Sequence, residues 1–260
     1  GRNDEKVAAA RARIAEETPN ANLEVVHLDL ASLASVREAA ARLGEHGVDV
    51  LVNNAGVMAL PRRETEDGFE MQLGVNHLGH FALTARLWPR VRDRVVTLTS
   101  LVHRVGKIAW SDLMGAARYR KWPAYAQSKL ANVLFALELH RRAEAAGSGV
   151  RSLFCHPGYA STNLQARGPK MEESGFMGGV MSFGNAAFAQ SAEAGAWPTV
   201  MAATADLPSG TFTGPSGLME SRGRPRLVEA SRAGRDPETA RRLWEVSEEL
   251  TSVLFDLGAS

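Results

Sequence analysis

The sequence has little cysteine, no excess charge of one sign and no long apolar run, and each absence excludes a class of protein. Its single cysteine, Cys155, excludes an internal disulfide framework and a multi-thiolate metal site. Thirty basic residues against 29 acidic ones leave a net charge of +1, without the concentrated positive field that nucleic-acid binding requires. No uninterrupted apolar stretch approaches the ~18 residues of a membrane span. We therefore expect no nucleic-acid partner and no membrane span, and a cytoplasmic location.

The remaining composition suits a folded α/β protein. The 260 residues, 45% of them apolar, supply one full core. Short apolar runs alternate with amphipathic stretches, which predicts βαβ units, and hence a doubly wound parallel sheet of Rossmann type in a three-layer α/β/α arrangement. The predicted strands cover residues 23–30, 48–53, 94–100 and 150–155, with an edge strand at 210–218. The predicted helices cover residues 6–17, 32–43, 69–90, 122–146, 191–205 and 236–255.

We expect residues 1–260 to form a single domain, because no linker, repeat or low-complexity segment divides the chain. Residues 163–190 are rich in Gly, Met and Phe, a composition that indicates an apolar lid over a substrate site.

Two polar residues stand out on the predicted helix 122–146. Tyr125 and Lys129 are four residues apart, so their side chains share one helix face. A neighbouring ammonium can lower the pKa of a phenol toward neutrality, which makes it a usable proton carrier. Taken alone, the pair could equally be part of a solvated helix face. Ser100, however, ends a predicted parallel strand, where open α/β sheets bind their ligands.

The complete set of motifs resembles the short-chain dehydrogenase/reductase family, in its retinol-dehydrogenase-like branch. The motifs appear in family order from residue 1 to about residue 255, and 25 residues separate the serine from the tyrosine. They are Asn53-Asn54-Ala55-Gly56, Asn76 in VNHLGHF, Ser100 in RVVTLTS, Tyr125 and Lys129 in AYAQSKLAN, and Pro157, Gly158 and Thr162 in HPGYAST.

The resemblance implies hydride transfer between a nicotinamide cofactor and an apolar carbonyl or alcohol substrate. In that family pattern Tyr125 exchanges the proton, Lys129 lowers the pKa of the phenol and binds the nicotinamide ribose, Ser100 orients the substrate oxygen, and Asn76 holds a water of the proton relay. A dimer or tetramer is also implied. His77 and His80 share a helix face but lack a third ligand nearby, so no metal is expected.

Cofactor contacts follow from the same resemblance. A basic residue after the second family strand grips the 2′-phosphate of NADP, and Arg2 matches it, so NADP(H) is the expected cofactor, with NAD(H) as the alternative. The other implied contacts are Asp29 and Leu30 at the adenine, Asn53, Ala55, Gly56, Tyr125 and Lys129 on the ribose side, and Pro157, Gly158 and Thr162 near the carboxamide.

One family feature is missing. No G-x-G-x-x-G occurs, and in the family topology two strands should separate residues 23–30 from residues 48–53. We therefore expect that the sequence starts at the end of the second family strand and lacks about forty residues, which comprise the first βα unit and most of that strand. As given, it is expected to bind dinucleotide poorly or not at all. A catalytically silent protein that senses redox state or binds a partner is the alternative function.

Overall fold

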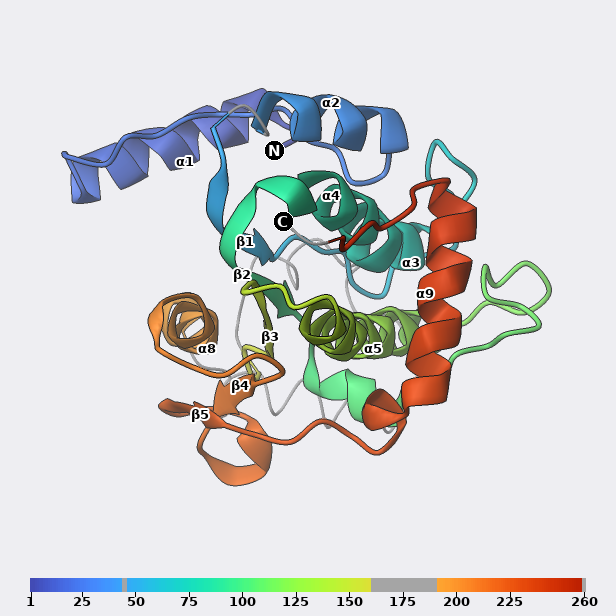
Figure 1. Cartoon of the computed structure of the whole chain (residues 1–260). Helices are drawn as coiled ribbons and strands as arrows, with labels where there is room; N and C mark the ends of the chain where they lie inside the picture. The colour runs from blue at the N-terminus through green and yellow to red at the C-terminus, as the bar shows by residue number, and fades with distance from the viewer. Residues whose placement is uncertain (44–45, 160–190, 259–260) are drawn as a thin grey trace.

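The computed structural model describes residues 1–43, 46–159 and 191–258, which form a five-stranded sheet between layers of helices (Figure 1). The strands lie side by side in chain order; β1 to β4 run parallel, and β5 runs antiparallel to β4. They are β1 (Val48–Asn53), β2 (Val91–Leu98), β3 (Arg151–Cys155), β4 (Phe212–Pro215) and β5 (Pro225–Leu227). The predicted α/β class, a mainly parallel sheet covered by helices, is confirmed.

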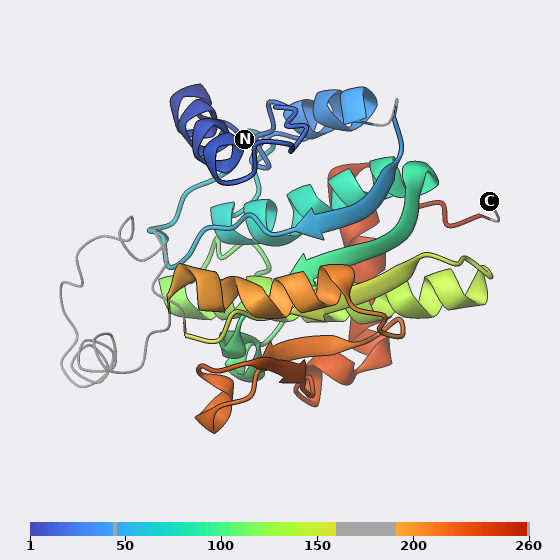
Figure 2. The same ribbon diagram turned by 90° about the vertical axis from the view of Figure 1, so that its left-hand side faces the viewer.

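Helices cover both faces of the sheet. α8 (Ala192–Thr204) covers one face, while α4 (Gly79–Leu87) and α5 (Lys121–Ala145) cover the other (Figures 1 and 2). α9 (Pro237–Thr251) packs outside α5, α2 (Leu33–Leu43) packs on α4, and α1 (Asp4–Glu17) extends away with no buried residue. The short elements are α3 (Met71–Leu73), η1 (Gly74–Leu78), η2 (Trp88–Arg90), η3 (Leu101–Val105), η4 (Leu218–Glu220) and η5 (Ala233–Arg235). No helix in the described ranges is long and apolar enough to cross a membrane.

The parallel strands bring their carboxyl ends to one edge of the sheet. Asn53 of β1 is paired with Thr97 of β2, and Leu98 of β2 with Cys155 of β3, so three strand ends lie in one row (Figure 2). Valine-rich sequences suit β1 and the mostly buried β2, because β-branched side chains pack well on a pleated surface. The loops that carry the predicted site residues leave from this row.

Aromatic rings fill the space between the helices. Trp244 of α9 stacks on Phe135 of α5 at 5.8 Å and on Phe255 at 4.7 Å, and Phe81 of α4 meets its edge at 5.2 Å between ring centroids. All four rings are buried. Such pairs contribute about 0.5–1.5 kcal/mol each beyond the burial of their surface. The cluster therefore fixes α9 and the C-terminal segment against α5.

The predicted strand at residues 23–30 is wrong. Its backbone is irregular, and Val26 and Leu28 hydrogen-bond only to the single residue Gly1, at 2.7 and 3.4 Å. A strand needs a ladder of backbone partners, and no described strand pairs with this segment.

Two other elements differ from their prediction. The predicted edge strand at 210–218 contains β4, but β4 lies between β3 and β5, so β5 and not β4 is the edge strand on this side of the described sheet. The predicted helix at 69–90 is divided by the π-helical turn η1, in which the Gly79 N–H bonds to the Gly74 carbonyl. The remaining predicted helices are confirmed to within a few residues; the last of them ends at Thr251 because Ser252 adopts a left-handed conformation, with φ of 52°.

A glycine at the start of α4 allows close packing. A Cβ added at Gly79 would lie 2.5 Å from the carbonyl oxygen of Leu30, closer than side-chain atoms approach. We expect Gly79→Ala to lower the free energy of unfolding by about 1–3 kcal/mol, measured by chemical denaturation. Gly149→Ala is the control, because an added Cβ there meets no atom within 4 Å. Equal stability of the two variants would contradict this account of the helix contact.

Candidate active site

Lys129 and Tyr125 lie on the buried face of α5, directly over the end of β2. Lys129 is 3% exposed, and its Nζ donates to the carbonyl oxygen of Leu98 at 3.4 Å. Asn132 Nδ2 donates to the same carbonyl at 2.9 Å, and Thr99 Oγ1 donates to the carbonyl of Lys129 at 2.7 Å. These contacts dock the helix on the strand end. Burial lowers the pKa of Lys129 to about 8.

The pKa of Tyr125 is raised, whereas the sequence predicted that it is lowered. Burial raises the pKa of Tyr125 to about 12, and the hydrogen bond with the Ser100 side chain only partly opposes this rise. Lys129 Nζ lies 5.8 Å from the centre of the Tyr125 ring. The expected lowering of the phenol pKa by the ammonium is therefore absent in this structure, because desolvation of both groups outweighs their interaction.

Ser100 lies two residues beyond β2 and begins the turn η3. Its Oγ accepts a long hydrogen bond of 3.5 Å from the Val102 N–H, which makes it the N-cap of the turn. Its carbonyl accepts from His103 Nδ1 at 2.7 Å. The Ser100 side chain interacts with the phenol of Tyr125, and the Ser100 backbone is held by His103.

Asn76 joins the loop after β1 to α5. Its Oδ1 accepts from the Val57 N–H at 2.7 Å, and its Nδ2 donates to the Val57 carbonyl and to Ser128 Oγ, both at 2.9 Å. Asn76 lies within the π-helical turn η1, which places its side chain between the two segments. In this structure the amide therefore holds protein groups together; its predicted role in a water relay stays a prediction.

His77 and His80, which lie near Asn76, form hydrogen bonds with other groups of the protein. His80 Nδ1 contacts the Asn76 carbonyl at 3.1 Å, and His77 Nε2 contacts Ser247 Oγ at 2.9 Å. Burial lowers the pKa of His77 to about 3 and that of His80 to about 4. In the described part of the chain, no group of three or more His, Cys, Asp or Glu side chains is placed to hold a metal.

The residues predicted on the ribose side follow the end of β1. Asn53 Nδ2 donates to Thr84 Oγ1 at 2.8 Å, while its Oδ1 is buried without a partner. Ala55 is exposed. A Cβ at Gly56 would lie 3.1 Å from Asn76 Oδ1 and 3.5 Å from Lys129 Nζ. An unpaired acceptor and a glycine beside a buried ammonium fit a polar ligand such as a nicotinamide ribose.

The carboxamide-side residues Pro157 and Gly158 follow β3. Gly158 has φ of 68°, and an added Cβ would lie 2.5 Å from the Ser221 carbonyl, so only glycine fits this turn. Its N–H donates to His156 Nδ1 at 3.1 Å. Thr162 and the predicted lid at 163–190 lie outside the described residues.

The adenine-side residues form a group of their own. Arg2 Nη1 lies 3.8 Å from Asp29 Oδ2, and the Arg2 side chain is 55% exposed. Asp29 Oδ1 accepts from the Ala31 N–H at 3.0 Å. Leu30 is buried in the core against α4. The guanidinium is exposed, but a phosphate would have to compete with the Asp29 carboxylate for it.

Sequence reasoning missed several residues that hold the pair on α5. Asn132 lies one turn after Lys129 and binds the same Leu98 carbonyl, and Ser128 receives the Asn76 amide. Both stand in AYAQSKLAN beside the polar residues Gln127 and Lys129, so the sequence pattern does not single them out.

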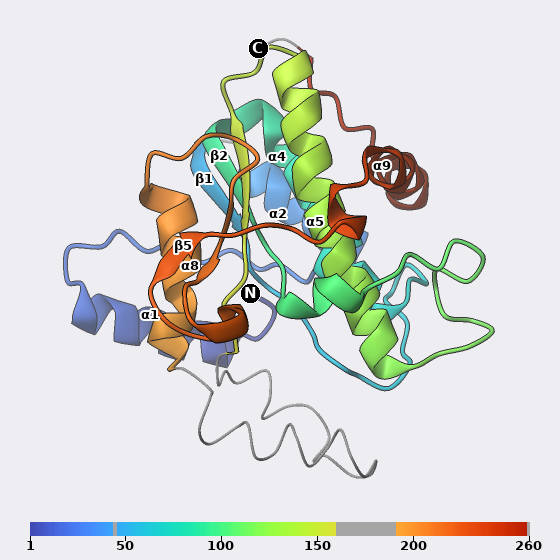
Figure 3. The same cartoon turned by 90° about the horizontal axis from the view of Figure 1, so that it is seen from below.

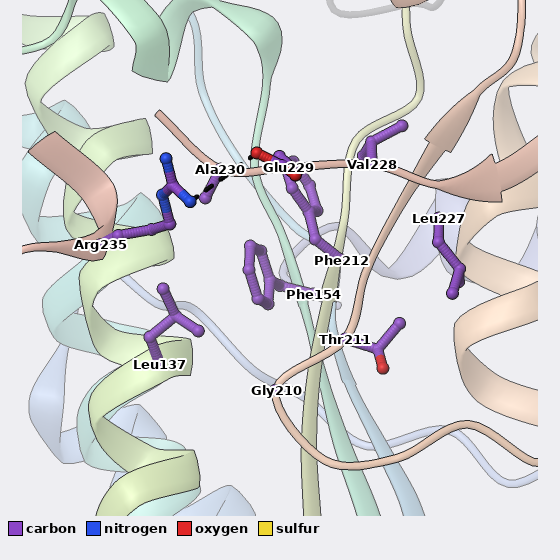
Figure 4. A pocket seen from close by; sticks show the side chains of 10 residues that line it. All are labelled: Leu137, Phe154, Gly210, Thr211, Phe212, Leu227, Val228, Glu229, Ala230 and Arg235. Atoms are coloured by element: carbon purple, nitrogen blue, oxygen red, sulfur yellow. Dashed lines mark ion pairs between the residues drawn. The ribbon is translucent and has the colours of Figure 1, made fainter. Parts of the chain in front are cut away.

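A pocket of about 260 Å³ opens between α5, β3, β4 and β5 (Figure 4). It is mainly apolar, lined by Leu137, Phe154 and Phe212, with Arg235 at its rim in an ion pair of 3.7 Å with Glu229. It contains none of the predicted site residues. The predicted catalytic residues therefore lie near the row of strand ends and not in this pocket.

Comparison with known proteins identifies the family. The family model for short chain dehydrogenase matches residues 1–173. Retinol dehydrogenase 13 of Homo sapiens is 50% identical over 170 residues, covering 63% of this chain and 51% of that protein, so the chain spans about half its length. Retinol dehydrogenase 13 of Mus musculus is 39% identical over 266 residues, which cover 99% of this chain and 77% of that protein. Polyprenol dehydrogenase of Mus musculus is 40% identical over 264 residues, which cover 96% of this chain and 73% of that protein.

Solved structures share the fold. An uncharacterized protein from Mycobacterium paratuberculosis is 43% identical with a TM-score of 0.76, covering 95% of this chain and 82% of that chain. A carbonyl reductase from chicken fatty liver, crystallised with NADPH, is 20% identical with a TM-score of 0.53, covering 79% of each chain.

The chain belongs to the short chain dehydrogenase family, a class of NAD(P)-dependent oxidoreductases. Its relatives place it in the retinol-dehydrogenase-like branch, as the sequence motifs predicted.

The burial of the Lys129 ammonium leads to a prediction about the stability of the protein. We expect Lys129→Met to raise the free energy of unfolding at pH 7 by about 1–3 kcal/mol, because the charge is buried with one long hydrogen bond. The pKa of Lys129 is lowered from 10.5 to about 8, so below pH 8 folded and unfolded chains both carry the proton and the folded state bears the full burial penalty. Between pH 8 and 10.5 the folded wild-type protein loses its proton first, and the advantage of Met shrinks.

Chemical denaturation of wild type and variant from pH 7 to pH 10.5 measures this difference. Lys107→Met, at an exposed position, is the matched control and should change stability by less than about 0.5 kcal/mol at every pH. A Lys129→Met protein less stable than wild type at pH 7 would show that the ammonium is stabilising.

Proposed function

We propose that the protein transfers a hydride between NADP(H) and the carbonyl or alcohol carbon of an apolar substrate. One arrangement carries the proposal: Tyr125 and buried Lys129 lie one helical turn apart on α5, Lys129 Nζ donates to the Leu98 carbonyl at the end of β2, and Ser100 follows two residues later, at the carboxyl ends of parallel strands. A proton donor, a second donor to the same oxygen and a cation in one water-poor site are what carbonyl reduction requires.

The side chains divide the work of proton transfer. Tyr125, with its raised pKa, is protonated at neutral pH and is the acid that protonates the carbonyl oxygen during reduction. Ser100 donates to the same oxygen and orients it. Lys129, when protonated, stabilises the phenolate that remains after the transfer. The nicotinamide cofactor, when bound, supplies the hydride in reduction and accepts it in oxidation.

The cofactor would be held by three groups of residues. Gly56 and Lys129 would border the nicotinamide ribose, and the turn of Pro157 and Gly158 would lie beside the carboxamide. The exposed Arg2 would bind the 2′-phosphate of NADP(H) and so favour it over NAD(H).

The substrate is proposed to be an apolar alcohol or its carbonyl form. Relatives are named retinol dehydrogenase and polyprenol dehydrogenase, and both named compounds are apolar alcohols. Trp122, 38% exposed, lies edge-on to the Tyr125 ring at 6.2 Å between centroids, so apolar surface borders the phenol. A cytoplasmic location, a homodimer or homotetramer and a single domain stay predictions.

Tyr125→Phe tests the chemistry. The variant keeps the ring and its packing but deletes the transferable proton, so kcat/KM for apolar aldehydes with NADPH should fall by at least ~10²-fold. NADPH absorbance measures turnover, and NADPH fluorescence should report unchanged cofactor binding. Tyr119→Phe is the control, since Tyr119 donates to the Leu60 carbonyl outside the site. NADPH binding by wild type without any turnover would support the silent sensor instead.

Arg2→Ala tests the cofactor preference. Loss of the guanidinium should weaken NADPH binding about tenfold, equivalent to ~1.4 kcal/mol, and leave NADH binding unchanged. Fluorescence titration of both cofactors measures the ratio. Arg13→Ala, on the exposed helix α1, is the matched control. A parallel loss of NADPH and NADH affinity in the Arg2 variant would argue against a 2′-phosphate contact.

A further inference from the structure

Glu220 lies between two elements that carry predicted site residues. It belongs to η4, in the connection from β4 to β5, and its side chain is 13% exposed. One carboxylate oxygen, Oε1, accepts from Arg104 Nη2 at 2.7 Å, and the other, Oε2, accepts from His156 Nε2 at 3.0 Å. Figure 3 shows the turn at 218–220 beside the turn at 101–105.

The arm through His156 leads to the turn of Pro157 and Gly158. His156 Nδ1 accepts from the Gly158 N–H at 3.1 Å, so the hydrogen of the ring is on Nε2, where it is donated to Glu220. The ring is completely buried, and burial lowers the pKa of His156 to about 4, so it is neutral in this arrangement. Glu220 therefore fixes both the orientation and the tautomer of the side chain that holds this turn.

The arm through Arg104 leads to Ser100. Arg104 lies in η3, the turn that Ser100 begins. In the same turn His103 Nδ1 donates to the Ser100 carbonyl at 2.7 Å, and His103 Nε2 accepts from the Ser231 N–H at 3.3 Å. The backbone behind the Ser100 hydroxyl is thus held from two sides.

Two residues of the connection between β4 and β5, Met219 and Glu220, have a strained backbone conformation. Met219 and Glu220 have φ of 52° and 55°, in the left-handed region that residues other than glycine seldom adopt. A Cβ at Gly214 would lie 2.2 Å from His156 Nε2, so the ring has room only against glycine. Strained residues persist where surrounding contacts fix them, and they cluster at functional sites.

We propose that Glu220 is a positioning residue that fixes the Ser100 turn and the Pro157–Gly158 turn relative to each other. The inference rests on the proposed function, in which the first turn orients the substrate oxygen and the second lies beside the nicotinamide. Glu220 touches neither substrate nor cofactor. Small displacements between groups on opposite sides of the reacting atoms lower the rate strongly, so one carboxylate bound to both turns is an effective brace.

Glu220→Gln tests the brace with little change in shape. The amide has one acceptor oxygen, so one of the two donors must lose its partner. We expect kcat with NADPH and an apolar aldehyde to fall about 10- to 100-fold, while the aldehyde KM changes less than about threefold. Glu229→Gln is the matched control, because Glu229 is exposed and pairs with Arg235 at 3.7 Å.

A second readout does not depend on activity or on bound cofactor. Hydrogen–deuterium exchange of the protein alone should become at least about fivefold faster in segments 98–106 and 152–159 of Glu220→Gln, with α9 unchanged. Arg104→Met, which removes one arm at a half-exposed position, should accelerate exchange in segment 98–106 only, and it carries the test if the Glu220 variant does not fold.

The outcomes separate the two proposals. If Glu220→Gln keeps wild-type kcat and exchange while Tyr125→Phe is inactive, the positioning role is wrong and the proposed function stands. A uniform rise in exchange over the whole chain, with kcat and KM changed equally, would also overturn it, because that is the signature of a general loss of stability. If wild type shows no turnover, the proposed function fails and the positioning role fails with it.

Discussion

The carbonyl of Leu98, at the last residue of β2, is the point on which the site depends. It accepts from Lys129 at 3.4 Å and from Asn132 at 2.9 Å, two residues on one face of α5. The neighbouring Thr99 side chain donates back to the Lys129 carbonyl at 2.7 Å. These bonds fix the position of the helix along the strand, and Ser100 is only two residues further on. The contact of Ser100 with Tyr125 is thus a consequence of how the helix docks on the end of the sheet.

Much of the fold follows from local pattern. β1 is predicted with its observed bounds, and α5 within one residue at each end, because a short valine-rich run and a long stretch of good helix formers that ends before Gly147 are local signals. The segment at 23–30 has the same kind of apolar run but is no strand, because its state depends on a partner elsewhere in the chain. β5 is three residues long and largely exposed, and it is defined only by its pairing with β4. Non-local pairing is the information that periodicity does not contain.

The candidate site likewise has features that local sequence predicts and features that depend on contacts distant in the sequence. The four-residue spacing of Tyr125 and Lys129 is local, so their common face could be predicted from the sequence alone. Their pKa values could not, because these depend on how completely the strand end covers both groups. Glu220 could not be singled out either, since its two partners lie 116 and 64 residues away and a lone glutamate in a turn has no distinctive pattern.

Burial shifts the pKa values of Tyr125 and Lys129 in opposite directions for a single reason. Desolvation penalises a phenolate and an ammonium alike, so the pKa of Tyr125 is raised to about 12 while that of Lys129 is lowered to about 8. Below pH 8 the pair then carries one unbalanced positive charge in a site with little water. Loss of the phenol proton to a substrate oxygen would leave a phenolate beside the Lys129 ammonium, 5.8 Å from the centre of the ring. Burial alone opposes that proton loss, and the attraction of the ammonium partly offsets the penalty, so the proposed role of Lys129 is to reduce a cost that burial imposes.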